Sequence, residues 1–316
     1  MLIALPESVT LCEVGPRDGL QNEAKILSVE EKLELIEGMA NAGFSAIEVG
    51  SFVHPKAVPQ MANTDEVFRR LRTREGVEYR ALIANLKGLE RASDCGCKKV
   101  KLNVSASKAH NIANLNRTPV ETVSEFKACV DAAKSLGIET SGSISMAFGS
   151  PWDREVPLSD VKEIVDAYLS VGIQEISLSD TSGQAYPTQV YGICTQIARE
   201  YPQVLWWLHY HNTRGLGLAN VLASMQAGFT RFDAAFAGVG GCPFVPGAAG
   251  NVTTEDLVHM CDEIGVATGV DLDRVLGVSR QLVQLLGHDT DSYLLRAGKS
   301  KDLLLELPVK RTQPKG

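Results

Sequence analysis

The sequence has no long hydrophobic run and no run rich in lysine or arginine. No apolar stretch reaches the roughly 18 residues that a membrane-spanning helix requires, so we expect no membrane span. The formal net charge is -7 and the basic residues are dispersed, which argues against a nucleic-acid or anionic-membrane surface. We therefore expect small molecules, rather than nucleic acid or a membrane, as partners.

Cysteine is sparse, and its pattern fits no disulfide framework. The 316 residues contain seven cysteines, an odd number without the spacing of a small disulfide-rich domain, which predicts reduced thiols. Cys95 and Cys97 lack the second cysteine or histidine pair that a structural zinc site needs. The segment "MLIALPESVT" has no secretory-signal features, and the final "QPKG" is no peroxisomal signal. We therefore expect a cytoplasmic protein.

Short β-rich runs alternate with amphipathic helical runs along the whole chain. Helical runs at 28–43, 119–137 and 159–172 begin at serine or proline and end at or beside a glycine, as helix boundaries prefer. Eight runs are predicted to be strands: 9–15, 46–51, 78–83, 99–105, 139–147, 175–180, 204–211 and 231–238. Eight βα units without a break in composition favour a closed parallel (β/α)8 TIM barrel.

The predicted organisation is a catalytic barrel with a C-terminal addition. We assign residues 1–265 to the TIM-barrel domain and residues 266–316 to a helical extension, which packs on the barrel or on a partner subunit. The extension includes an apolar-periodic helix at 271–287. A doubly wound open sheet is the alternative fold, but the turn "GPRDGLQ" after the first strand lacks its phosphate-binding glycine fingerprint.

Polar side chains gather at or after the carboxyl ends of the predicted strands, where active sites of such barrels lie. A lone polar residue at such a place is often only a helix cap, but a set of them at one rim predicts a site. The set consists of Arg17, Asp18, Glu48, Ser51, Asn103, Ser105, Asp180, His209, His211, Cys242 and Asn251.

His209 and His211 lie two residues apart in a predicted strand, so both imidazoles project from the same face. Imidazole, carboxylate and amide oxygen together suit a divalent metal, with Asp18 and Asn251 supplying the oxygens. The amide oxygen favours Mg²⁺ or Mn²⁺ over zinc, which usually recruits a third histidine, a glutamate or a cysteine. The alternative is that both histidines are ordinary core residues.

The glycine-rich stretch at 237–257 contains a single thiol, Cys242. Pro243 and Pro246 prevent a helix from starting directly after the glycines, and the spacing of a phosphate-binding loop is absent. We expect a mobile loop that carries Cys242 over the metal site as a proton donor or base. The alternative is a cysteine incidental to a tight turn.

Several of these segments together closely resemble the 3-hydroxy-3-methylglutaryl-CoA lyases, which are metal-dependent TIM barrels. The segments are "EVGPRDGLQNE" (13–23), "SFVHPKAVPQM" (51–61), "NLKGLE" (85–90), the His-x-His strand and "GGCPFVPGAAGNVTTEDLVHM" (240–260). The resemblance covers about residues 8–270 and implies metal ligands at Asp18, His209, His211 and Asn251. It also implies catalytic roles for Arg17, Asp18, Glu48, Asp180, His209 and Cys242.

The implied reaction is a retro-Claisen cleavage of 3-hydroxy-3-methylglutaryl-CoA, or of a closely related 3-hydroxyacyl-CoA diacid. The products are acetyl-CoA and acetoacetate or the matching 3-keto acid. Mg²⁺ or Mn²⁺ would activate the 3-hydroxyl, with Asp18 or His209 accepting its proton. Arg17 would stabilise the thioester enolate and Cys242 would protonate it. The resemblance further implies a homodimer and a place in leucine degradation.

Two positions depart from the better-known lyases. The segment "NTRG" (212–215) stands where those enzymes carry an aspartate and then a tyrosine, and Ala24 stands where many carry a lysine. Arg214 could pair with a second carboxylate or polar group of a related acyl chain, or it could be a surface arginine. The reaction type is therefore better defined than the acyl chain.

Three other functions compete with the lyase. A Claisen-type synthase of the same superfamily would lack the Cys242 loop and carry a longer C-terminal regulatory region. A Schiff-base aldolase needs a lysine at a strand end, but "EISLSD" (175–180) has none, and Lys99 and Lys101 lie early in their strand. A non-catalytic barrel would not need the metal-ligand set.

Overall fold

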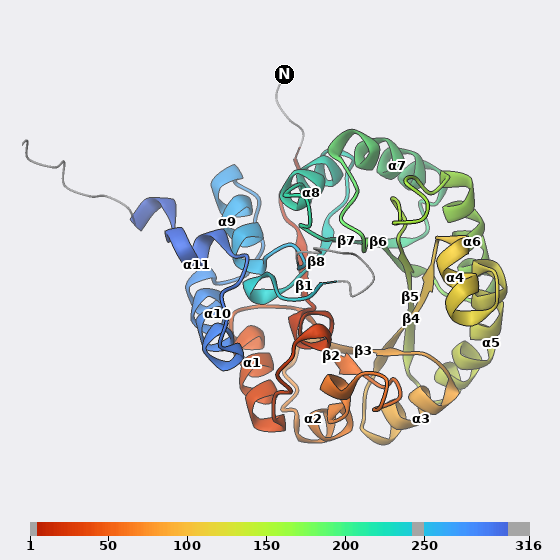
Figure 1. The fold of residues 1–316 in the computed structure, drawn as a ribbon, viewed down its shortest axis with the longest axis horizontal. Coiled ribbons are helices and arrows are strands. Elements are labelled where there is room, and N and C mark those ends of the chain that lie inside the picture. Colours follow the sequence, from red (N-terminus) through yellow and green to blue (C-terminus); the bar gives the residue numbers. More distant parts are fainter. Residues whose placement is uncertain (1–4, 242–249, 303–316) are drawn as a thin grey trace, which may run out of the picture.

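The structure, a computed structural model, describes residues 5–241 and 250–302. Eight parallel strands close into a barrel in chain order, surrounded by helices (Figure 1), which confirms the predicted TIM-barrel fold. The strands are β1 (Thr10–Glu13), β2 (Ala46–Ser51), β3 (Glu78–Ile83), β4 (Lys99–Ser105), β5 (Glu139–Ser145), β6 (Glu175–Asp180), β7 (Leu205–Tyr210) and β8 (Arg231–Ala234). All eight lie within the predicted runs, and β1, β5, β7 and β8 end earlier than predicted.

The helices follow the predicted alternation. They are α1 (Val29–Asn41), α2 (Thr64–Arg70), α3 (Leu86–Asp94), α4 (Lys108–Leu115), α5 (Pro119–Ser135), α6 (Leu158–Val171), α7 (Pro187–Glu200), α8 (Gly217–Gln226), α9 (Thr254–Ile264), α10 (Leu272–Leu286) and α11 (Tyr293–Ala297). Ser28 and Thr118 start α1 and α5 with capping boxes, in which each side chain accepts a backbone N–H and the third helical residue, a glutamate, reciprocates. No helix in the described ranges is long and apolar enough to cross a membrane.

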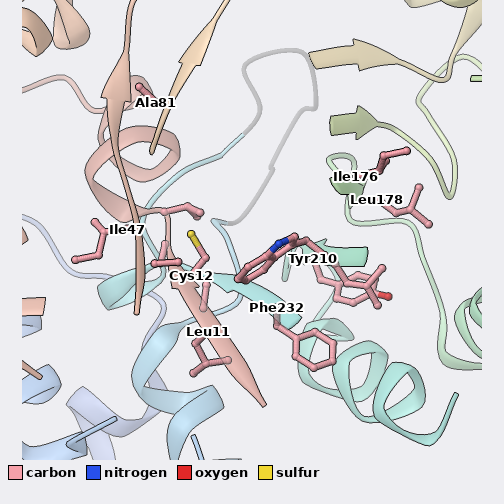
Figure 2. Packing of buried hydrophobic residues seen from close by; sticks show 14 of the residues in the cluster. Leu11, Cys12, Ile47, Ala81, Ile176, Leu178, Tyr210 and Phe232 are labelled. Carbon is pink, nitrogen blue, oxygen red and sulfur yellow. The ribbon is translucent and has the colours of Figure 1, made fainter. Parts of the chain in front are cut away.

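The apolar core lies between the strands and the surrounding helices. Side chains alternate along a strand, so residues next to inward-facing ones point toward the helices. Tyr210, for example, follows the inward-facing His209 and pairs its hydroxyl with that of Ser224 on α8, at 2.7 Å. Figure 2 shows Tyr210 with Leu11 and Phe232 in this buried cluster.

The strands of the barrel also carry buried charged side chains. Near the amino ends of the strands, Lys99 Nζ lies 2.8 Å from Glu78 Oε2 and 2.5 Å from Glu175 Oε2. Arg80 Nη1 lies 3.3 Å from Glu175 Oε1. We call these four residues the lower ion-pair network. Because burying charge is costly unless it is paired, these contacts stabilise the charged side chains of the interior.

The C-terminal helices lie on the outside of the barrel. Helix α10 packs against α1 and α9, beside which it appears in blue in Figure 1. A Cβ at Gly38 of α1 would lie 2.7 Å from Val278 Cγ2 of α10, so a glycine at this position allows the two helices to approach. The division between a domain at 1–265 and an extension at 266–316 stays a prediction.

Candidate active site

A cavity of about 440 Å³ opens at the carboxyl ends of the strands. This is the end at which TIM barrels place their chemistry. The polar residues that line it include Arg17, Asp18, Lys101, His209, His211 and Asp233. The structure therefore brings together residues from β4, β7, β8 and the segment after β1.

Asp18, His209 and His211 form the metal-binding candidate at this cavity. One ligand atom from each lies within 4.8 Å of the others, and all three residues are buried. The two histidine Nε2 atoms are 3.1 Å apart, and Asp18 Oδ2 lies 3.8 Å from that of His209 and 3.9 Å from that of His211. The period of two along β7 turns both imidazoles into the barrel, as the sequence predicts.

Asp18 is presented by an unusual turn. Residues Gly15–Gly19 form a π-helical turn, and the N–H groups of Arg17, Asp18 and Gly19 all lie within 3.3 Å of the carbonyl oxygen of Val14. Such turns recur at functional sites because they re-aim side chains without ending the chain's hydrogen bonding. Here the turn directs Arg17 and Asp18 into the cavity directly after β1.

Asn251 completes the set and provides the test of whether a cation fits. Its Nδ2 donates to Asp18 Oδ2 at 2.9 Å and to the carbonyl oxygen of Val239 at 3.1 Å. Its Oδ1 is buried and has no hydrogen-bond partner within the described ranges. A buried acceptor without a donor is costly, and a metal ion supplies the missing partner.

The buried charges around the cavity also favour a bound cation. Three buried carboxylates, Asp18, Glu48 and Asp233, face two buried cations, Arg17 and Lys101, which leaves one excess negative charge. A divalent cation would compensate that charge at a site where imidazole and oxygen ligands already converge. The residues present therefore fit Mg²⁺ or Mn²⁺.

The electrostatics keep the ligands in their metal-binding forms. Burial raises the pKa of the Asp18 carboxyl, but Arg17 and the two histidines lower it further, so it stays well below its usual range. Burial and the neighbouring His209 lower the pKa of His211 to about 4. Both groups are consequently deprotonated at neutral pH, as metal binding requires.

Arg17 is held at the cavity by two carboxylates. Its Nε donates to Glu48 Oε1, and its Nη1 lies 2.5 Å from Asp18 Oδ1. Although burial raises the pKa of Glu48, Arg17 and then Lys101 lower it below its usual value. The sequence-based assignment of Arg17 and Glu48 to one site therefore agrees with their geometry.

Two residues of the site, Lys101 and Asp233, are absent from the sequence-based set. Lys101 Nζ lies 2.6 Å from Glu48 Oε2, and Asp233 Oδ2 lies 3.2 Å from His209 Nδ1. Burial raises the pKa of Asp233, but Lys101 and His209 lower it to about 2. Asp233 on β8 is in register with His209 on β7, and this pairing between strands is not visible in the sequence.

Asp180 and Arg214 lie outside the cavity lining. The Asp180 carboxylate accepts the N–H groups of Gln184 and Ala185, at 2.9 and 3.1 Å. Exposed Arg214 donates from Nη1 to the carbonyl oxygens of Ser182 and Gly183. Both side chains thus hold the loop between β6 and α7, and the catalytic role of Asp180 stays a prediction.

The thiols divide into a buried set and one outside the described ranges. Cys12, Cys95, Cys97, Cys129, Cys194 and Cys261 are all free and buried. Cys242 falls within 242–249, outside the described residues, so its role stays a prediction.

Comparisons with known proteins identify the family. The family described as HMGL-like matches residues 8–282. The (R)-citramalyl-CoA lyase of Chloroflexus aurantiacus is 41% identical over 92% of this chain and 95% of its own length. The hydroxymethylglutaryl-CoA lyase YngG of Bacillus subtilis is 37% identical over 93% of this chain and 99% of its own.

A solved structure gives the same result. The HMG-CoA lyase from Acinetobacter baumannii, in complex with coenzyme A and 3-methylmalate, superposes with a TM-score of 0.91 and 43% identity. The match covers 96% of this chain and 98% of that one. The resemblance inferred from the sequence motifs is confirmed, and the chain belongs to the HMGL-like family of carbon–carbon lyases.

Proposed function

We propose that the protein cleaves 3-hydroxy-3-methylglutaryl-CoA, or a closely related 3-hydroxyacyl-CoA diacid, in a reaction that depends on a divalent metal. The products are acetyl-CoA and acetoacetate or the matching 3-keto acid. The observation that carries the proposal is the convergence of Asp18, His209 and His211 beside Arg17 in one cavity. The family and the names of the relatives support the substrate class.

Asp18, His209, His211 and Asn251 would hold Mg²⁺ or Mn²⁺. The bound cation supplies Lewis-acid activation of the 3-hydroxyl and of a neighbouring carbonyl or carboxylate oxygen. The proton of the 3-hydroxyl passes to a basic group of the same cluster, for which Asp18 and His209 are the candidates. The burial of these residues keeps bulk water from competing with the substrate for their polar atoms.

Arg17 stabilises the thioester enolate that cleavage leaves. Glu48 and Asp18 engage its Nε and Nη1, and Nη2 has no partner among the described residues, so we assign Nη2 to the enolate oxygen. A preorganised donor of this kind contributes on the order of 3 kcal/mol, or roughly a hundred-fold in rate. We assign the protonation of the enolate carbon to Cys242.

A citramalyl thioester is the second candidate substrate, because a relative with that activity in its name is 41% identical to this chain. Its carboxylate is attached directly to the carbon that bears the hydroxyl, so cleavage would leave a 2-keto acid. The solved relative with 3-methylmalate bound adds support, because that ligand is also a short hydroxydiacid.

The test is acetyl-CoA release from the two thioesters with Mg²⁺ or Mn²⁺, in parallel with EDTA-treated protein. We expect metal-dependent turnover that is lost in His211→Ala and in Cys242→Ala. Turnover of the citramalyl thioester alone would assign the second substrate. A protein that binds the metal and cleaves neither thioester would refute the proposal. Light scattering of the same preparation tests the homodimer that we also propose.

A further inference from the structure

A series of buried contacts under the cavity connects Arg17 to His209 through Lys101. Arg17 Nε donates to Glu48 Oε1, and Lys101 Nζ lies 2.6 Å from Glu48 Oε2. The same Nζ lies 3.7 Å from Asp233 Oδ2, which in turn lies 3.2 Å from His209 Nδ1. Lys101 therefore stands between the arginine of the site and one of its metal ligands.

Lys101 orients both of the carboxylates that it contacts. Its side chain is 4% exposed, that of Glu48 is 0% and that of Asp233 is 2%, so none of these charges is stabilised by bulk water. Asp233 Oδ1 has no partner within the described ranges, and the orientation of the carboxylate therefore rests on the Oδ2 contacts with Lys101 and His209. Without the ammonium group, two buried carboxylates would lose their shared counter-ion.

We propose that Lys101 is a positioning residue of the metal centre, acting on His209 through Asp233 and on Arg17 through Glu48. The contact of His209 Nδ1 with Asp233 turns the other ring nitrogen, Nε2, toward His211 and Asp18. Partners of this kind, behind the ligands of a metal, fix the tautomer and orientation of the imidazole. The inference rests on the metal site of the proposed function.

Lys99 offers a matched control on the same strand. It lies two residues before Lys101 on the inward face of β4 and its side chain is 6% exposed. It bridges two carboxylates of the interior, and its Nζ also lies 3.8 Å from the exposed carboxylate of Glu139. The two interior carboxylates, Glu78 and Glu175, belong to the lower ion-pair network, and Lys99 does not line the cavity. Replacing Lys99 removes the same charge from the interior without touching the metal site.

The experiment measures the Kd of Mn²⁺ by electron paramagnetic resonance of the free ion, which requires no turnover. We expect Lys101→Met and Asp233→Asn each to weaken Mn²⁺ binding about ten-fold or more. Lys99→Met should stay within about two-fold of the parent while lowering the melting temperature. The double variant Lys101→Met/Asp233→Asn should bind no more weakly than the weaker single variant, because the lysine acts on His209 through the aspartate.

The direction of the change separates positioning from simple charge. Removing a positive charge near a cation site tightens binding of the cation by Coulomb's law, so weaker binding reports lost positioning. An unchanged or tighter Kd in Lys101→Met would overturn the inference, as would equal weakening in Lys99→Met. Should Lys101→Met fail to fold, Lys101→Gln is measured instead, because only the loss of the positive charge separates positioning from Coulomb attraction, and an unchanged or tighter Kd in that variant also overturns the inference.

A failure of this inference can be distinguished from a failure of the proposed function. Turnover of the thioesters is measured on the parent protein alone. An inactive parent that binds Mn²⁺ refutes the proposed substrate, and the role of Lys101 is then decided by the Mn²⁺ Kd values of the variants. An active parent with an unaltered Kd in Lys101→Met refutes only the inference, and a parent that binds no Mn²⁺ refutes both.

Discussion

Replacing Glu48 by glutamine would test how the site holds Arg17, the arginine that we propose to stabilise the enolate. Glu48 is fully buried and accepts from both Arg17 and Lys101, whereas a glutamine amide has only one acceptor oxygen. Breaking one side of a buried ion pair costs about 3–5 kcal/mol of stability because a charge is left uncompensated. If Arg17 is then no longer oriented toward the enolate oxygen, the transition state loses stabilisation on the order of 3 kcal/mol, which lowers kcat roughly a hundred-fold.

The assay compares kcat at saturating Mn²⁺ and urea unfolding in Glu48→Gln and Glu175→Gln. Glu175 contacts Lys99 and Arg80 in the lower ion-pair network, so its substitution should cost similar stability and leave kcat unchanged. A kcat of Glu48→Gln within about three-fold of the parent would refute the orienting role. Equal losses of kcat in both variants would show that general loosening of the barrel, rather than the aim of Arg17, limits turnover.

Three further outcomes are expected. Saturating Mn²⁺ should stabilise the parent by about 2.7 kcal/mol at a hundred times its Kd, and His211→Ala should lose this gain in a thermal-shift assay that uses EDTA as reference. Burial raises the pKa of Glu13 from 4.5 to about 8, so stability that is fully present below pH 4.5 is lost as the pH rises toward 8. Glu13→Gln should flatten this part of the curve of urea midpoint against pH, and an unchanged slope would contradict the assignment. Gly142→Ala should cost about 1–3 kcal/mol, because its Cβ would lie 2.9 Å from the Tyr168 ring, whereas Gly192→Ala, with open space in α7, should be stabilising or neutral in urea unfolding.

The fold follows from the sequence because its signals are local. Strand alternation, capping residues and glycines at helix ends all act over a few positions, and they locate every strand of the barrel. The ends of β1 and β8 are exceptions, since Glu13 Oε1 accepts the N–H groups of Gly15 and Phe236 and draws both segments away from strand geometry. That contact joins residues that only the closed barrel brings together.

The difference between local signals and contacts made only in the closed barrel also explains which site residues the sequence predicts. The spacing of His209 and His211 on one strand is visible in the sequence, and their proximity is confirmed. Lys101 and Asp233 are not visible in this way, because their roles depend on pairing between strands that barrel closure brings face to face. Asp180 ends a strand as an active-site residue would, and its catalytic role stays a prediction. Backbone N–H groups of the following loop engage both of its oxygens, which the sequence does not show.

The lower ion-pair network has a consequence for temperature. The hydration of ions becomes less favourable on heating, so the desolvation penalty of Arg80, Lys99, Glu78 and Glu175 falls as the temperature rises. Hydrophobic stabilisation per unit area levels off over the same range. The amino end of the barrel interior, where this network lies, should therefore lose less of its stabilisation on warming than an interior of leucine and valine would. The proposed metal site at the carboxyl end should accordingly keep a stable base at higher temperature.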